Sequence, residues 1–201
     1  MPLFIVFEGG EGSGKSTQAR ALTKRMHNTD RPVILTHEPG GTPIGNKLRH
    51  WIKWGNHLTP ETELLFILAA RRQLLAEIIR PALRDGVTII VDRYYYSTIA
   101  YQGYGRGMDV HLLYTFNNFV TEGLQPDLVV FLDMEPKAGL IRKRCKKDRF
   151  EQEDVIFHER VREGYLDMAR NDPDRWFVID ATLSRKEIED LIWERVQKLS
   201  D

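Results

Sequence analysis

The chain has 201 residues, of which 42% are hydrophobic, and its 29 basic side chains balance 29 acidic ones. This length suits one domain, expected over residues 1–201, and the zero net charge gives no global attraction to nucleic acid or to an anionic membrane. The single cysteine, Cys145, cannot form an internal disulfide, and the apolar run Leu3–Phe7 is too short for a signal peptide. We therefore expect a cytoplasmic protein with no nucleic-acid or membrane partner.

Short apolar segments recur along the chain and are typical of β-strands. All but the last are nearly unbroken runs of Val, Ile, Leu and Phe, as expected of parallel strands that are buried on both faces. The expected strands are Leu3–Glu8, Pro32–His37, Val87–Asp92, Asp127–Asp133 and Trp176–Asp180.

Segments with helix signals separate these strands. The expected helices run from the glycine-rich segment to about Asn28, from Thr59 to Asp85-Gly86, from Asp109 to Glu122, and onward from Ser184, which makes a capping box with Glu187. This alternation predicts an α/β fold of three layers, in which a five-stranded parallel sheet has helices on both faces. In such a fold, ligands bind beyond the carboxyl ends of the strands.

The segment Gly9–Ser16 matches the phosphate-loop motif G-x-x-x-x-G-K-S/T in full, after an expected strand and before an expected helix. In this motif, backbone N–H groups and the start of a helix hold the phosphates. Lys15 is expected to reach the β- and γ-phosphates, and Ser16 to bind Mg²⁺. The ATP-binding residues predicted here are Gly9, Gly10, Glu11, Gly12, Ser13, Gly14, Lys15, Ser16 and Thr17.

The phosphate loop leaves several classes of protein open. A GTPase would need an N-K-x-D segment, but Asn46-Lys47 is followed by Leu48-Arg49. Motor and transport ATPases are usually larger and have partner-binding domains. A small kinase with the P-loop kinase fold fits best.

Two arginines stand out beyond the phosphate loop. Arg71 lies in a strongly apolar helix, so its guanidinium must be paired or must reach solvent. Arg93 directly follows a buried strand, where it could bind an acceptor phosphate with two hydrogen bonds. Taken singly, each arginine is better explained as a surface or ion-paired residue, and only the other motifs favour a functional role.

The motifs together resemble those of thymidylate kinases, in that family's order and over essentially the whole chain. They are the phosphate loop, Glu-Pro-Gly-Gly-Thr from Glu38, Ala-Ala-Arg ending at Arg71, Asp-Arg-Tyr-x-x-Ser-x-x-Ala-Tyr-Gln-Gly from Asp92, and Asp-Arg-Phe-Glu-Gln-Glu from Asp148. The resemblance implies transfer of the ATP γ-phosphate to thymidine monophosphate (dTMP) with Mg²⁺ as cofactor, and a homodimer.

The resemblance also implies roles for individual residues. Arg93, helped by Arg49, would hold the phosphate of dTMP, while Arg71 and Thr98 would contact the thymine. Further implied contacts are Tyr101 against the sugar 2′ position, Glu11 at the 3′-hydroxyl, Asp92 organising Mg²⁺ through water, and Ala181-Thr182 bordering adenine. The other predicted substrate-binding residues are Glu38, Pro39, Ile67, Ser97 and Gln102. Ile67 stands where the family usually has a phenylalanine, which removes an aromatic contact worth about 1 kcal/mol.

A basic stretch from Arg142 to Arg149 allows three interpretations: a solvated charged helix, a nucleic-acid patch, or a lid over ATP at about residues 139–153. The zero net charge and the lack of interleaved aromatic residues count against nucleic acid. Some thymidylate kinases carry an arginine in the phosphate loop and others in the lid, and the loop position here is Gly12. Arg149 is therefore the best catalytic candidate after Lys15 and Arg93, with Arg142 and Arg144 as further ATP-binding candidates.

Two alternatives to a thymidylate kinase stay open on the sequence. One is a P-loop kinase of another nucleotide, which Ile67 suggests. The other is a switch that binds ATP without transferring its phosphate, although a switch has no need of a second pocket.

Overall fold

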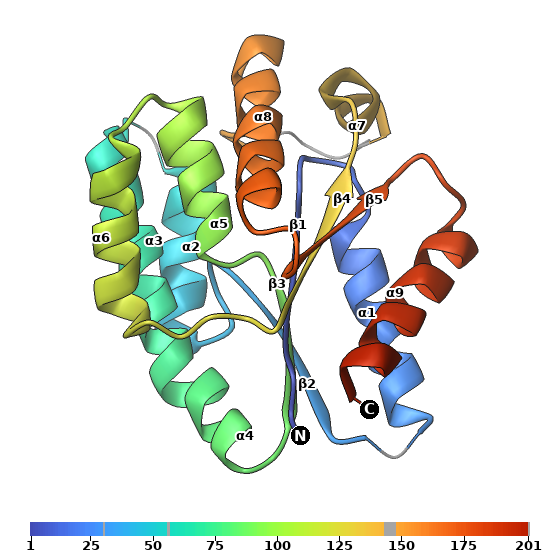
Figure 1. Cartoon of the computed structure of the whole chain (residues 1–201). Helices are drawn as coiled ribbons and strands as arrows, with labels where there is room; N and C mark the ends of the chain where they lie inside the picture. The colour runs from blue at the N-terminus through green and yellow to red at the C-terminus, as the bar shows by residue number, and fades with distance from the viewer. Residues whose placement is uncertain (30, 56, 143–147, 201) are drawn as a thin grey trace.

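The structure is a computed structural model that describes residues 1–29, 31–55, 57–142 and 148–200. A five-stranded sheet with every strand parallel forms its centre, in the order β2-β3-β1-β4-β5 (Figure 1). The strands are β1 (Phe4–Gly9), β2 (Val33–His37), β3 (Thr88–Asp92), β4 (Leu128–Asp133) and β5 (Trp176–Asp180). All five expected strands are confirmed, with bounds within one residue of those predicted.

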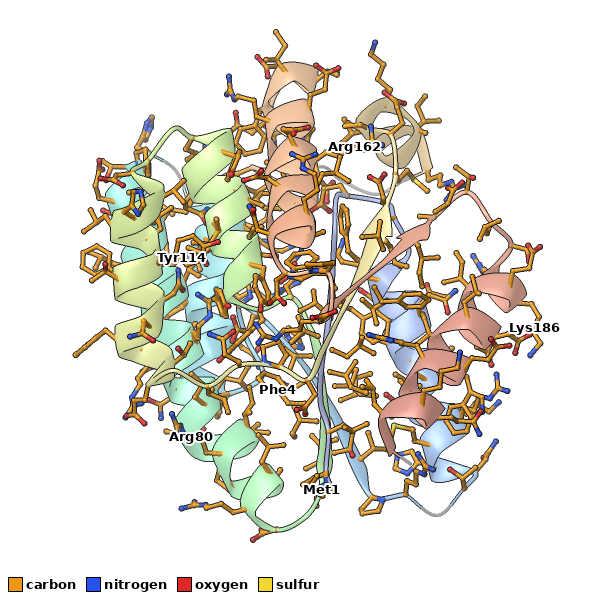
Figure 2. All side chains as sticks on the ribbon, in the orientation of Figure 1. Met1, Phe4, Arg80, Tyr114, Arg162 and Lys186 are labelled. Atoms are coloured by element: carbon orange, nitrogen blue, oxygen red, sulfur yellow. The ribbon has the colours of Figure 1, made fainter. Side chains whose placement is uncertain are left out.

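Helices cover both faces of the sheet, which gives the three predicted layers. On one side lie α1 (Lys15–His27) and α9 (Arg185–Ser200), and on the other lie α3 (Pro60–Leu74), α6 (Val110–Thr121) and α8 (Val155–Asn171) (Figure 1). Side chains fill both spaces between the layers (Figure 2). Successive residues of β1 alternate between the two cores: Phe4 and Val6 pack with α3 and α8, and Ile5 and Phe7 with α1 and α9.

The expectation that β2 is buried on both faces is wrong. Ile34 in the middle of this strand is 38% exposed. The reason is topological, because β2 lies at the edge of the sheet and the helical layers cover the central strands most completely. Its apolar run therefore resembles that of a central strand without sharing its burial.

The long helix expected from Thr59 begins as predicted but is not a regular α-helix throughout. The Thr59 hydroxyl accepts a hydrogen bond from the amide of Thr62 at 3.3 Å, and Pro60 takes the first helical position. After α3 the chain widens into a π-helical segment, η1 (Leu75–Ile79), and continues as α4 (Arg80–Arg84). Pro81 has no amide proton to donate to the preceding turn, and such a break is a common setting for a π-helical segment.

The other predicted caps are also present. The Asp109 carboxylate accepts from the amide of His111 at 2.8 Å at the start of α6. Before α9, the Ser184 amide donates to the Glu187 carboxylate at 2.9 Å, and the Glu187 amide donates to the Ser184 hydroxyl at 3.3 Å. This reciprocal pair is a capping box, and it satisfies two backbone donors that the helix itself leaves without acceptors.

Further helices follow the strands near the carboxyl edge of the sheet. They are α2 (Pro43–Trp54), α5 (Tyr95–Thr98) with its π-helical continuation η2 (Ile99–Gly105), and α7 (Pro136–Arg142). The register sets Asp92 of β3 beside Phe7 of β1 and His37 of β2, so the segments that follow these strands start from neighbouring points. Over the described residues, no helix combines the length and apolarity needed to cross a membrane.

Candidate active site

A cleft of about 740 Å³ opens at the carboxyl ends of β1, β2 and β3, where a parallel sheet binds its ligands. Its size suits a nucleotide-sized ligand. Most of the predicted site residues line it, namely Glu11, Gly12, Ser13, Gly14, Lys15, Ser16, Thr17, Glu38, Pro39, Arg49, Ile67, Arg71, Asp92, Arg93, Ser97, Thr98, Tyr101, Gln102, Arg142 and Ala181. The fold therefore brings the phosphate loop and the predicted acceptor residues to one cavity.

The phosphate loop curls around its own lysine. The Lys15 ammonium donates to the Gly10 carbonyl at 2.6 Å and lies 3.3 Å from the Ser13 hydroxyl. Gly12 and Gly14 adopt positive φ angles of 71° and 95°, which let the loop turn directly into α1. Burial lowers the pKa of the Lys15 ammonium from its usual 10.5 to about 8, and the nearby positive charge of Arg93 acts in the same direction.

Gly12 has a packing reason to lack a side chain. A Cβ atom there would overlap the carbonyl oxygen of Gly139 in α7, and a Cβ on Gly139 would overlap the carbonyl oxygen of Glu11. The backbones of the phosphate loop and of α7 therefore touch directly. In this arrangement an arginine at position 12 has no room.

Ser16, the last residue of the phosphate loop, contacts Asp92 at the end of β3: the Ser16 hydroxyl donates to the Asp92 carboxylate. A hydroxyl and a carboxylate are the oxygen donors that Mg²⁺ takes from a protein when phosphates and water complete its shell. The two residues at this position fit the predicted cation.

Arg93 is fixed by contacts on both ends of its guanidinium. Nη2 donates to the Glu11 carboxylate at 2.7 Å and to the Tyr101 hydroxyl at 3.1 Å. Nη1 donates to the Gly9 carbonyl and to the hydroxyls of Ser97 and Tyr165, at 3.1 to 3.2 Å. The residue has φ of 75°, a backbone conformation that non-glycine residues rarely adopt and that concentrates at functional sites.

Arg71 is buried, with 1% of its surface exposed, and its guanidinium is paired as we expected for an arginine in an apolar helix. Its Nε donates to the Glu38 carboxylate at 2.6 Å, and its Nη1 donates to the Thr98 hydroxyl at 3.0 Å and to the Asn117 side-chain oxygen. Burial raises the pKa of the Glu38 carboxyl to about 7, although the guanidinium of Arg71 acts against this shift. Arg71 is thus held rigidly while it lines the cleft.

Some predicted residues do not line the cleft. Gly9, Gly10 and Thr182 lie outside its lining, and Arg144 lies outside the described residues, as does the rest of the predicted lid from 143 to 147. Arg142 lines the cleft and donates to the Ala181 carbonyl at 3.0 Å.

Arg149 does not line the cleft in this conformation. Its Nη2 lies 3.4 Å from the buried carboxylate of Glu63, and its guanidinium also donates to the carbonyls of Ile52 and Leu58. The catalytic role predicted for it stays a prediction and requires the side chain to leave Glu63.

Sequence reasoning missed several residues that support the site. Glu8 accepts hydrogen bonds from the Tyr94 amide and from the Ser97 and Tyr165 hydroxyls. Asn117 accepts a hydrogen bond from Arg71. Glu63 accepts hydrogen bonds from Gln102 and Arg106. Of these residues, only Glu8 has a feature in the sequence that could have pointed to it, because it is a charged side chain at the end of an apolar strand. Asn117 and Glu63 lie in amphipathic helices, where a polar residue looks the same in sequence whether it faces solvent or the core.

These features define the class: a P-loop phosphotransferase of the α/β type, in which polar side chains share one cleft with the phosphate loop. Comparisons with known proteins narrow this class to a family. The sequence model of a family described as thymidylate kinase matches residues 7–192. Curated thymidylate kinases from Dehalococcoides mccartyi (strain CBDB1) and Deinococcus radiodurans are 47% and 45% identical to this chain, each over 98% of it and over 96% and 97% of the relative.

A solved structure agrees with the sequence matches. The crystal structure of thymidylate kinase from Ehrlichia chaffeensis aligns with a TM-score of 0.81 and 33% identity, covering 97% of this chain and 98% of that one. The chain therefore belongs to the thymidylate kinase family.

The contact between the phosphate loop and α7 predicts unequal effects of two alanine substitutions. Gly12→Ala should lower the free energy of unfolding by about 1 to 3 kcal/mol, because the methyl group overlaps the Gly139 backbone and Gly12 has positive φ. Gly10→Ala is the matched control, since no described atom lies within 4 Å of the Cβ it would add, and should change stability by less than about 0.5 kcal/mol. Urea unfolding measures both, and equal losses would contradict the packing argument.

Proposed function

We propose that the protein transfers the γ-phosphate of ATP to dTMP, giving thymidine diphosphate for the synthesis of dTTP. Family membership supports this reaction, and one structural observation carries it: Lys15 of a complete phosphate loop and Arg93, a fixed cation on the acceptor side, line one cleft. A kinase of another nucleotide and a non-catalytic ATP switch are not favoured, because the relatives are thymidylate kinases and the cleft is lined by Arg71 and Arg93 as well as by the phosphate loop.

Phosphoryl transfer requires that the two substrates be positioned and that positive charge lie near the transferring phosphate. Phosphoryl transfer passes through a loose transition state with charge spread over the γ-phosphate oxygens, so cations supply most of the stabilisation. Lys15 would hold the transferring phosphate and Arg93 would align the acceptor phosphate, which already carries its charge and needs no general base. Ser16 and Asp92 would hold Mg²⁺, which supplies further neutralisation of the phosphates.

Acceptor binding would rearrange the contacts around Arg93. Its Nη2 is occupied by the Glu11 carboxylate, so an incoming phosphate competes with Glu11 for this guanidinium. We propose that Glu11 then turns to the 3′-hydroxyl of the sugar, with Tyr101 against the 2′ position. The acceptor pocket would be completed by Arg49, Glu38, Pro39, Ile67, Ser97 and Thr98, and the ATP side by Arg142 and Ala181. Thr182 stays a candidate for the ATP side that lies outside the cleft lining.

A panel of nucleoside monophosphates tests the reaction. ATP consumption should be stimulated most strongly by dTMP, because the pocket offers fixed hydrogen-bond groups to the base and little room at the sugar 2′ position. A coupled assay of nucleoside diphosphate formation measures kcat/KM for each acceptor. A clear preference for another monophosphate would support the kinase of a different nucleotide, and the absence of acceptor-stimulated turnover would support the switch.

The lowered pKa of Lys15 predicts proton uptake when ATP binds. With a pKa of about 8 in the free protein, most Lys15 side chains are neutral at pH 8.5, and the phosphate charges should raise the pKa again and restore the ammonium. Calorimetric titrations at pH 8.5 in buffers of different ionisation enthalpy should therefore show uptake of about 0.7 proton per site.

The control for this titration is Lys15→Arg, whose guanidinium stays charged at pH 8.5 in both the free and the bound protein. The uptake should disappear in this variant even if its affinity is lower. The same uptake in the wild type and in Lys15→Arg would assign the proton to another group.

We also infer that the protein forms a homodimer through the outer faces of α6 and α3. Leu112, Phe116 and Phe119 form an apolar stripe at helical spacing on α6, and Leu65 on the neighbouring α3 is 60% exposed. Contiguous exposed apolar surface of this kind is typical of protein interfaces.

One charged substitution tests this dimer. Phe119→Asp should give monomers in sedimentation or light-scattering measurements, because Phe119 is 80% exposed and a buried carboxylate without a partner is costly in an interface. Ile141→Asp is the matched control, since Ile141 is also 80% exposed but belongs to α7, which lies apart from α6 and α3 (Figure 1). A wild-type monomer, or loss of the dimer in both variants, would rule out this interface.

A further inference from the structure

Glu63 is a buried carboxylate that neither the phosphate loop nor the acceptor contacts above explain. It lies in the first turn of α3 and has no exposed surface. Two arginines surround it: Arg106 donates from Nε at 2.8 Å and from Nη2 at 3.1 Å, and Nη2 of Arg149 lies at 3.4 Å. The side-chain amide of Gln102 also donates to this carboxylate, from Nε2 at 2.8 Å.

The two guanidinium groups determine what Glu63 can offer to Gln102. Arg106 donates to both oxygens of this carboxylate and Arg149 lies beside one of them, so Glu63 acts as a hydrogen-bond acceptor on both oxygens. The amide of Gln102 must therefore turn its NH₂ group toward Glu63. Its oxygen, Oε1, is then the amide atom available to a ligand, since Gln102 lines the cleft.

Arg71 supplies the complementary group on the same cleft. Its Nε is used by Glu38 and its Nη1 by Thr98 and Asn117, which leaves Nη2 as its free donor nitrogen among the contacts of the described residues. The pocket wall thus presents a fixed donor from Arg71 and a fixed acceptor from Gln102.

We propose that Glu63 is a positioning residue for base specificity: it fixes the Gln102 amide with its oxygen toward the cleft, so that the cleft selects a base with an N–H group beside a carbonyl. Thymine and uracil have this pattern, with O4 as acceptor and N3–H as donor. Cytosine has the reverse, an amino donor beside an unprotonated ring nitrogen, and would leave both protein groups without partners. The proposal rests on the proposed function, because it takes a pyrimidine nucleotide as the acceptor.

The test is Glu63→Gln, which keeps the shape of the side chain but lets position 63 donate as well as accept. Gln102 can then rotate, and the ratio of kcat/KM for dTMP to that for dCMP should fall on the order of tenfold. The ratio of dTMP to dUMP should stay constant, because these two bases share the O4 and N3–H pattern. A merely structural role for Glu63 would lower turnover with all three acceptors equally.

Glu153→Gln is the matched control. Glu153 pairs with the same Arg106 at 2.8 Å, so the substitution removes one negative charge from the same group of ion pairs without changing the acceptor that faces Gln102. The dTMP to dCMP ratio should keep its wild-type value in this variant. An equal fall of the ratio in Glu153→Gln would show that charge alone matters and would overturn the proposal.

Folding is tested in parallel, because Glu63→Gln leaves two partly buried arginines near a neutral amide. If thermal melting shows that the single variant does not fold, Glu63→Gln combined with Arg106→Gln replaces the main ion pair by two amides, and the dTMP to dCMP ratio should fall in it as well. An unchanged ratio in the folded variant would overturn the role of Glu63 while leaving the kinase activity in place. A wild-type protein that phosphorylates none of the monophosphates would instead overturn the proposed function itself.

Discussion

The carboxylate of Glu8 is the contact on which the acceptor side of the cleft depends. It is fully buried at the end of β1 and accepts from the Tyr94 amide at 2.8 Å and from the hydroxyls of Ser97 and Tyr165 at 2.6 and 2.9 Å. Burial raises its pKa, and these donors act against the shift. The same two hydroxyls accept from Arg93, so Glu8 fixes the turn that carries Arg93 and the groups that orient its guanidinium.

Two further buried carboxylates repeat this arrangement around the cleft. Glu38 holds Arg71, and Glu63 holds Gln102, so each of the three acids contacts a side chain that lines the cavity. A buried charge is tolerated when hydrogen-bond donors compensate it, and such donors leave few alternative rotamers. Both oxygens of Glu8 and of Glu63 accept hydrogen bonds, whereas Oε1 of Glu38 has no hydrogen-bond partner among the described residues. The cleft is therefore pre-organised by Glu8 and Glu63 behind its lining and by Glu38, which itself lines the cavity, and this rigidity suits a reaction that depends on positioning.

The sequence predicts those elements of the structure that short local patterns of residues determine. Apolar runs and capping residues such as Thr59 and Asp109 gave the strands and the helix starts, and the glycines with Lys15 gave the phosphate loop. The roles of Glu63 and Asn117 depend on which face of a helix packs against another element. This tertiary contact cannot be predicted from the local pattern of a single sequence. The π-helical segments and the exposure of β2 likewise result from tertiary packing, which overrides the local pattern.

The origin of the catalytic positive charge shows how packing constrains chemistry. Gly12 cannot carry an arginine because the Gly139 backbone occupies that space, so cations beyond Lys15 and Arg93 must reach the transferring phosphate from outside the loop. Among the described residues of the basic stretch, Arg142 already lines the cleft, whereas Arg149 helps to neutralise Glu63. Moving Arg149 to the phosphates would leave this buried carboxylate with Arg106 as its remaining guanidinium contact, a loss that opposes the movement. The two roles of Arg149 compete, and in this conformation its pairing with Glu63 prevails.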